Sequence, residues 1–149
     1  MATYTEQVGN KLNNLLEKTY DAEKGFKKVA ENVENNSLKS YFNQKAQERY
    51  EFGHELKGEI KSFNQDVDKG GSLVGDAHRA WMDVKKIFTS DNEESMLEEA
   101  IRGEKSSVEE YNEVLNETSL PLSTKNVLEK QKTTIENGLS NIKSLEDLS

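Results

Sequence analysis

The apolar residues of this chain recur at alternating intervals of three and four over most of its length, and this spacing constrains the fold more than any other feature. Successive residues of an α-helix are rotated by about 100°, so such a spacing places the apolar side chains along one helix face. The only proline is Pro121, so little interrupts long helices. The pattern predicts an all-α protein. In the first predicted helix the inward stripe comprises Val8, Leu12, Leu15, Thr19, Ala22, Phe26, Val29 and Val33.

Five helices are predicted, and four of them have similar lengths, about 35–44 Å at about 1.5 Å per residue. The economical arrangement is an up-and-down four-helix bundle of these four, with the short helix on the connection between the second and the third. In the rival arrangement the first four helices form the bundle and the last packs outside. A length of 149 residues suits one domain, residues 1–149. The predicted helices span residues 5–33, 38–63, 73–88, 93–115 and 124–145, with 73–88 as the short one.

The composition narrows the classes of partner. Hydrophobic residues make up 33% of the chain and charged residues 32%, but the strict periodicity indicates well-solvated helices rather than disorder. The formal net charge is -8, and an acidic surface repels nucleic acids and anionic membranes, so we expect neither as a partner. Cysteine is absent, which excludes disulfides and thiolate chemistry. Since no membrane-spanning or signal-peptide pattern is present, we expect a cytoplasmic protein.

One string has the Glu-x-x-His spacing of di-metal bundle proteins, namely Glu51 to His54. The helical rotation places both residues opposite the apolar residues Phe42 and Leu56, so we expect them to face solvent. The sequence contains no second Glu-x-x-His string. The spacing therefore does not predict a metal site.

Four polar residues interrupt the apolar stripes near the predicted mid-height of the bundle: Glu23, Arg49, Glu104 and Gln131. In one interpretation Glu23 and Glu104, with His78 as a further candidate, bind iron or manganese. In the other, the carboxylates bind Arg49, whose five N–H donors can satisfy two of them. A fixed cation disfavours binding two metal ions beside it. We therefore expect a structural polar layer of the four residues, with no cofactor and no catalytic residue.

The predicted short helix carries His78 and Trp81. Trp81 follows the apolar stripe and His78 lies on its flank. A histidine base or an anion site is one interpretation, but no serine or cysteine partner is evident. We favour an anchor, in which Trp81 docks the short helix and His78 hydrogen-bonds at its edge. A cavity lined by both side chains would instead indicate a small-ligand binder.

Several strings taken together resemble a known family: Asp21 to Phe26 with Ala30–Glu31, His78 to Trp81, and Leu97 to Glu99 with Gly103–Glu104. Over residues 5–117 the chain resembles a bacterial family of small, uncharacterised ferritin-like four-helix-bundle proteins, catalogued as a domain of unknown function. The resemblance implies a ferritin-like fold and no established activity.

The function expected from these observations is that of a non-enzymatic, ferritin-like bundle that acts as a cytoplasmic interaction or stress-associated protein. Its partner would be another protein or a second copy of the chain. The stress-associated role follows from fold analogy alone. The alternative is a metal-binding protein or di-metal oxidoreductase that uses Glu23, Glu104 and His78. A small-ligand binder is the second alternative.

Overall fold

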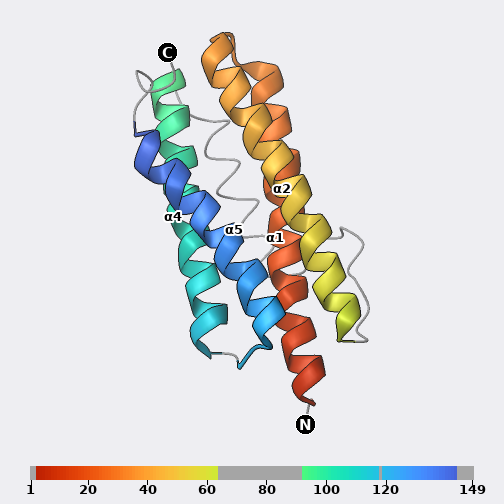
Figure 1. Cartoon of the computed structure of the whole chain (residues 1–149). Helices are drawn as coiled ribbons and strands as arrows, with labels where there is room; N and C mark the ends of the chain where they lie inside the picture. Colours follow the sequence, from red (N-terminus) through yellow and green to blue (C-terminus); the bar gives the residue numbers. More distant parts are fainter. Residues whose placement is uncertain (1–2, 64–91, 118, 144–149) are drawn as a thin grey trace.

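The structure is a computed structural model, which describes residues 3–63, 92–117 and 119–143 (Figure 1). Those residues form α-helices and short connections with no strand, which confirms the all-α fold. The helix bounds lie within a few residues of the predicted ones. The predicted helix over 73–88 lies outside the described residues, as do His78 and Trp81. The helices are α1 (Tyr4–Asn32), α2 (Asn36–Ser62), α4 (Glu93–Glu117) and α5 (Leu122–Asn141).

Asparagine side chains cap the N-termini of two of the helices. The Asn35 side-chain oxygen accepts a hydrogen bond of 3.0 Å from the backbone N–H of Leu38, at the start of α2. The Asn92 side-chain oxygen accepts one of 2.8 Å from the backbone N–H of Ser95, at the start of α4. The first N–H groups of a helix have no partner within it, so these bonds satisfy donors that would otherwise need water. They explain where α2 and α4 begin.

The four helices form a bundle in which α1 lies beside α2 and α4, and α5 lies beside α4 and α2 (Figure 1). α2 and α4 therefore face each other across the diagonal. The backbone N–H of Asn35 donates to a carboxylate oxygen of Glu93 at 3.1 Å, which joins the starts of α2 and α4. The Tyr4 hydroxyl donates to the carbonyl of Ser119, which joins the start of α1 to the far end of α4. Neighbouring helices are thus antiparallel, whereas α2 and α4 run parallel.

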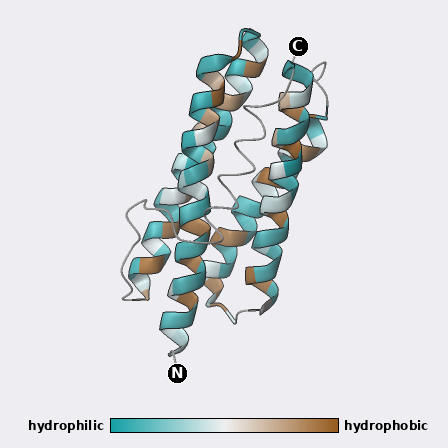
Figure 2. Ribbon diagram, turned by 180° about the vertical axis from the view of Figure 1, so that it is seen from behind, coloured by the Kyte–Doolittle hydropathy of each residue, from teal (hydrophilic) through white to brown (hydrophobic). Residues whose placement is uncertain are grey.

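Buried apolar side chains form two clusters, one toward each end of the bundle, and hydrophilic residues predominate on the outer surfaces (Figure 2). Each cluster draws residues from both α1 and α2. α5 contributes Leu128 and Ile135, which are fully buried, so it belongs to the bundle rather than packing outside it. The first cluster is centred on Val8, Leu12, Leu16, Leu56, Ile60, Leu128 and Ile135, and the second on Phe26, Val29, Leu38, Phe42, Leu97 and Ala100.

The bundle consists of two helical hairpins. α1 and α2 form one and share the most extensive contact of any helix pair. α4 and α5 form the other, and contacts between the hairpins are sparser. None of the described helices is long and apolar enough to cross a lipid bilayer. The interior between the hairpins is where the polar residues of the stripes lie.

Candidate functional site

An ion pair connects α2 and α4 in the interior. An Nη atom of Arg49 donates a hydrogen bond to Oε1 of Glu104. Arg49 is only 3% exposed and Glu104 only 2%. Both residues lie between the two apolar clusters along their helices, so the pair separates one cluster from the other. The structure thus brings together two of the four residues of the expected polar layer.

Lys45 and Glu48 complete this arrangement, which we call the charge layer (Lys45, Glu48, Arg49 and Glu104). The second Nη atom of Arg49 lies 2.7 Å from Oε1 of Glu48. The Lys45 ammonium lies 3.4 Å from Oε2 of Glu104 and 3.6 Å from Oε1 of Glu48. Oε2 of Glu104 is buried and accepts no hydrogen bond, so Lys45 provides its charge compensation. Two cations and two carboxylates make the charge layer neutral.

The position of Lys45 depends on a glycine of α5. A Cβ atom built on Gly138 would lie 2.8 Å from Nζ of Lys45, closer than carbon and nitrogen atoms pack. The missing side chain leaves the space in which the ammonium lies. α5 therefore takes part in the charge layer without contributing a charge.

Arg49 also packs between two aromatic rings. Its guanidinium carbon lies 5.8 Å from the centre of the Phe26 ring and 5.6 Å from that of Phe52. A guanidinium near an aromatic face gains a cation–π attraction, which is strengthened when water is excluded. Burial alone would lower the pKa of Arg49, but the Glu104 and Glu48 carboxylates outweigh it and hold that pKa above its ordinary value. Arg49 is a permanent cation at the centre of the bundle.

Burial dominates the pKa of Glu48, the carboxylate at the edge of the charge layer. It raises the pKa of Glu48 above its ordinary value, against the opposing effect of Lys45 and Arg49. Of the two carboxylates in the charge layer, Glu48 is the more exposed, with 19% of its side chain accessible to solvent against 3% for Glu104.

Gln131, the α5 residue of the expected polar layer, is fully buried and joins a neighbouring network. The Tyr111 hydroxyl donates to its side-chain oxygen at 2.6 Å. Its side-chain nitrogen donates to the Phe52 carbonyl and to a Glu55 carboxylate oxygen, both at 3.3 Å. Every polar atom of the Gln131 side chain therefore has a partner, as a buried amide requires. Burial raises the pKa of the Tyr111 hydroxyl well above its ordinary value, so it remains a donor.

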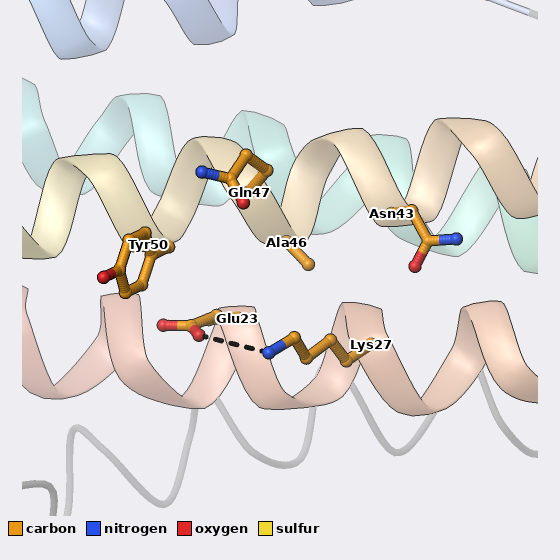
Figure 3. A pocket seen from close by; sticks show the side chains of 6 residues that line it. All are labelled: Glu23, Lys27, Asn43, Ala46, Gln47 and Tyr50. Atoms are coloured by element: carbon orange, nitrogen blue, oxygen red, sulfur yellow. Dashed lines mark ion pairs between the residues drawn. The ribbon is translucent and has the colours of Figure 1, made fainter.

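Glu23 does not belong to the charge layer, so its predicted place there was wrong. Its side chain is 20% exposed and pairs with Lys27 one turn along α1, at 3.9 Å. It lies in a surface hollow of about 410 Å³ between α1 and α2, together with Tyr50 (Figure 3). By spacing Glu23 belongs to the inner stripe of α1, four residues after Thr19 and three before Phe26, but its side chain lies on the flank of that stripe toward α2, where it pairs with Lys27.

The other candidates fall outside this interior. Glu51 and His54 are exposed on the outer side of α2, which confirms that they face solvent. The His54 ring packs edge-on against the Tyr50 ring, with 4.7 Å between their centres. His78 and Trp81 are not among the described residues, so the anchor role stays a prediction.

The donor set of the charge layer does not fit a pair of metal ions. Each of its two carboxylates is already paired with both Lys45 and Arg49. Across the residues described, no group of three or more His, Asp and Glu side chains could hold a metal ion. Metal ions would have to displace two positively charged side chains that the fold holds in place.

Sequence reasoning missed several interior polar residues. Lys45 lies seven residues after Leu38 and four before Arg49, so the stripe spacing itself marks it as inward-facing. Tyr111 follows Val108 by three residues and so has the apolar spacing of α4, but its hydroxyl has a buried polar role. Glu17 is also buried, at 2% exposure. For Lys45 the available signal was an inward position occupied by a long charged side chain, whereas Glu17 follows the stripe residue Leu16 by one position and the spacing does not mark it as buried.

A comparison with family models finds a match over residues 7–117, which span α1, α2 and α4 and leave α5 beyond the matched region. The family is described as a domain of unknown function. A search of curated proteins finds no match. The match covers well over half of the chain. On this evidence the chain belongs to the family DUF2383, a domain of unknown function.

Proposed function

We propose that this protein is a non-enzymatic, ferritin-like helical bundle that acts through its surface, as a cytoplasmic interaction or stress-associated protein. In this proposal the interior is a structural layer that contains no metal ion. The observation that carries the proposal is the pairing of Glu104 with Arg49 and Lys45 at the centre of the bundle.

The charges of the interior support a structural rather than a catalytic role. A di-metal site needs several carboxylates that are free to bind cations. Here Arg49 and Lys45 occupy the space around both carboxylates, and their charges sum to the charge that the carboxylates carry. Buried ion pairs of this kind contribute little net stability but favour one arrangement of the helices over others. We infer that the charge layer sets the register between the two hairpins.

The helix directions support the ferritin-like part of the proposal. α2 ends at one end of the bundle and α4 begins at the other, because both run in the same direction. Ferritin-like bundles have one long connection of this kind, whereas simple up-and-down bundles have short ones throughout. Fold analogy of this sort bears on architecture and does not assign an activity.

In the metal-binding alternative, Glu23 and Glu104 would bind metal ions. It needs Glu23 and Glu104 in one site, but Glu23 lies in a surface hollow between α1 and α2 and Glu104 lies in the interior. Its third candidate, His78, and the small-ligand alternative, which depends on His78 and Trp81, concern residues outside those described. They stay predictions.

Metal analysis of the full chain tests the proposal. The protein, purified without a tag, would be incubated anaerobically with Fe(II) or Mn(II), desalted and analysed for bound metal, beside Glu104→Gln and Glu23→Gln. We expect no stoichiometric metal and no metal-dependent rise in melting temperature for any of the three. Stoichiometric iron or manganese in the wild type that is lost in Glu104→Gln would overturn the proposal in favour of the metal-binding alternative.

A further inference from the structure

A surface groove of about 540 Å³ lies between α2 and α5, directly outside the charge layer. We call it the α2–α5 groove. It follows from the sparse packing between the two hairpins, which leaves the sides of these helices apart. Its lining comprises Gln44, Gln47, Glu48, Glu51, Phe52 and Glu55 on α2, and Lys130 and Thr134 on α5.

The α2 side of the groove is a continuous helix face. Its residues recur at intervals of three and four from Gln44 to Glu55 and so lie along one side of α2 over about three turns, or about 17 Å. Residues of this face are mostly long and polar, and α5 opposes them with only Lys130 and Thr134. The groove therefore has the length and the openness to accept another helix.

Two carboxylates of this face, Glu51 and Glu55, retain the capacity to bind a further cation. No Lys or Arg of the described residues pairs with Glu51, which is exposed. Glu55 pairs at 3.6 Å with Lys130, whose side chain is 74% exposed. Exposed ion pairs of this kind contribute little to stability, so a stronger partner could replace Lys130. Glu48 is already paired with Lys45 and Arg49 in the charge layer.

Phe52 supplies an apolar element at the bottom of the groove. Phe52 is only 6% exposed, and its ring packs near the Arg49 guanidinium. An apolar bottom between acidic residues matches the helix-in-groove mode of recognition, in which an amphipathic helix inserts apolar anchors and pairs its charges at the rim.

We propose that the α2–α5 groove binds a basic amphipathic helix of about three turns from a partner protein. The proposal rests on the proposed function, since it names the kind of partner through which a non-enzymatic bundle would act. Lys or Arg residues spaced by three or four on the incoming helix would face Glu51 and Glu55, and an apolar residue beside them would lie over Phe52. Charge complementarity selects this occupant, because a second copy of the chain would bring a further net charge of -8.

A designed peptide and two matched variants test the proposal on the full chain. The probe is a fluorescein-labelled helical peptide of about 14 residues, with Lys spaced by three and four on one face and Leu between them. The groove variant is Glu51→Lys with Thr134→Lys. The control variant is Glu109→Lys with Thr133→Lys, at exposed sites outside the groove lining. Both variants change the net charge equally, so they respond equally to non-specific attraction.

Anisotropy titrations would be run at 0.15 M salt, where the Debye length of about 8 Å screens distant charges. We expect the groove variant to bind about ten-fold more weakly than the wild type and the control variant to stay within about two-fold. Equal losses in both variants would show bulk attraction to an acidic protein and overturn the proposal, as would no binding to the wild type. Thermal melts of both variants, whose mutated residues make no contact in the charge layer, verify that they fold.

Amide chemical shifts provide a second measurement that does not depend on the variants. We expect peptide-induced shifts to concentrate on residues 44–55 and 130–134, and shifts centred on another surface would overturn the proposal. Because the metal analysis above concerns Glu104, its outcome is independent of this titration. Failure of the peptide to bind would remove the groove assignment alone, whereas a metal centre would remove the proposed function.

Discussion

Arg49 on α2 and Glu104 on α4 form a buried ion pair across the diagonal of the bundle, between its two apolar clusters. The two helices are not neighbours, so the pair spans the interior rather than one helix–helix contact. Lys45 and Glu48 surround it and make the charge layer neutral. Four side chains that are costly to bury singly therefore depend on one another.

Removal of one partner of this pair should be far more harmful than removal of both. Arg49→Leu leaves the buried Glu104 carboxylate with Lys45 alone, and we expect the free energy of unfolding to fall by about 3–5 kcal/mol. The melting temperature should fall by about 10 °C. Arg49→Leu with Glu104→Leu should recover much of this loss, because an apolar pair needs no compensation. Urea denaturation of the two single variants and the double variant measures the coupling.

Arg102 provides the control, since it also pairs with a glutamate but its side chain is 67% exposed. Arg102→Leu should change stability by no more than about 0.5 kcal/mol. If Arg49→Leu has an effect as small as this, the ion pair contributes nothing measurable and the structural role of the charge layer is contradicted.

Tyr111→Phe should alter how stability depends on alkaline pH. Burial raises the pKa of Tyr111 well above its ordinary value of 10, although Arg49 opposes the shift. Above pH 10 the unfolded chain loses this proton while the folded protein keeps it. Tyr111 therefore makes the wild type lose about 1.4 kcal/mol of stability per pH unit, up to its folded pKa. Tyr111→Phe removes this loss, so the two proteins should converge in stability as the pH rises above 10.

At pH 7 the same variant should be less stable than the wild type by about 1–3 kcal/mol, because the buried oxygen of Gln131 loses its donor. Urea-unfolding free energies at pH 7 and between pH 9 and 11 measure both effects. Tyr50 is exposed, so Tyr50→Phe should leave the stability at pH 7 unchanged within about 0.5 kcal/mol. A stability difference between wild type and Tyr111→Phe that stays constant with pH would contradict the first expectation.

Gly138→Ala and Gly58→Ala should differ in sign. Alanine in a helix is favoured over glycine by about 0.5–1 kcal/mol, and nothing lies within 4 Å of a Cβ at Gly58, so Gly58→Ala should stabilise the protein. A Cβ at Gly138 would displace the Lys45 ammonium from the buried Glu104 carboxylate. Gly138→Ala should therefore destabilise. In a Lys45→Met background that penalty should disappear, and a gain in the original background would show that Lys45 relocates without loss.

Glu59→Ala should weaken the start of α5. The N-cap residue Pro121 makes no side-chain capping bond, and Glu59 on α2 instead accepts hydrogen bonds from Thr124 at 2.7 Å and Ser123 at 3.3 Å. Thr124 is only 1% exposed, so its hydroxyl would lose a partner, and the helix N-terminus would lose a neighbouring anion. We expect a loss of about 1–2 kcal/mol, measured by urea unfolding. Glu51→Ala, which removes the same charge from an exposed site, should be close to neutral.

The periodicity of the apolar residues predicted the four described helices and the arrangement of α5 within the bundle. It succeeded because each stripe is long and few residues break it. Arg49, Glu104 and Gln131 could be identified as interior residues for the same reason, since each takes the place of an apolar residue in an otherwise regular stripe.

The apolar spacing does not determine which contacts Glu23 and Lys45 make. Glu23 has the inner spacing of α1, yet its side chain pairs with Lys27 in the hollow beside α2 rather than with Arg49. The spacing places Lys45 inward, but the space for its ammonium depends on Gly138, more than ninety positions later. The α2–α5 groove depends likewise on how far two helices stand apart. A stripe on one helix contains no information about such a long-range fit.

The sparse packing between the hairpins also has a consequence for assembly. Each hairpin is formed by consecutive helices, and the charges of α2 meet that of α4 only when the hairpins dock. An α4–α5 hairpin of one molecule could therefore replace that of another and restore every interior contact, including Arg49 with Glu104. Exchange of this kind, or domain swapping, needs no new interface. The ion pair between the hairpins is thus the same whether both hairpins come from one chain or from two.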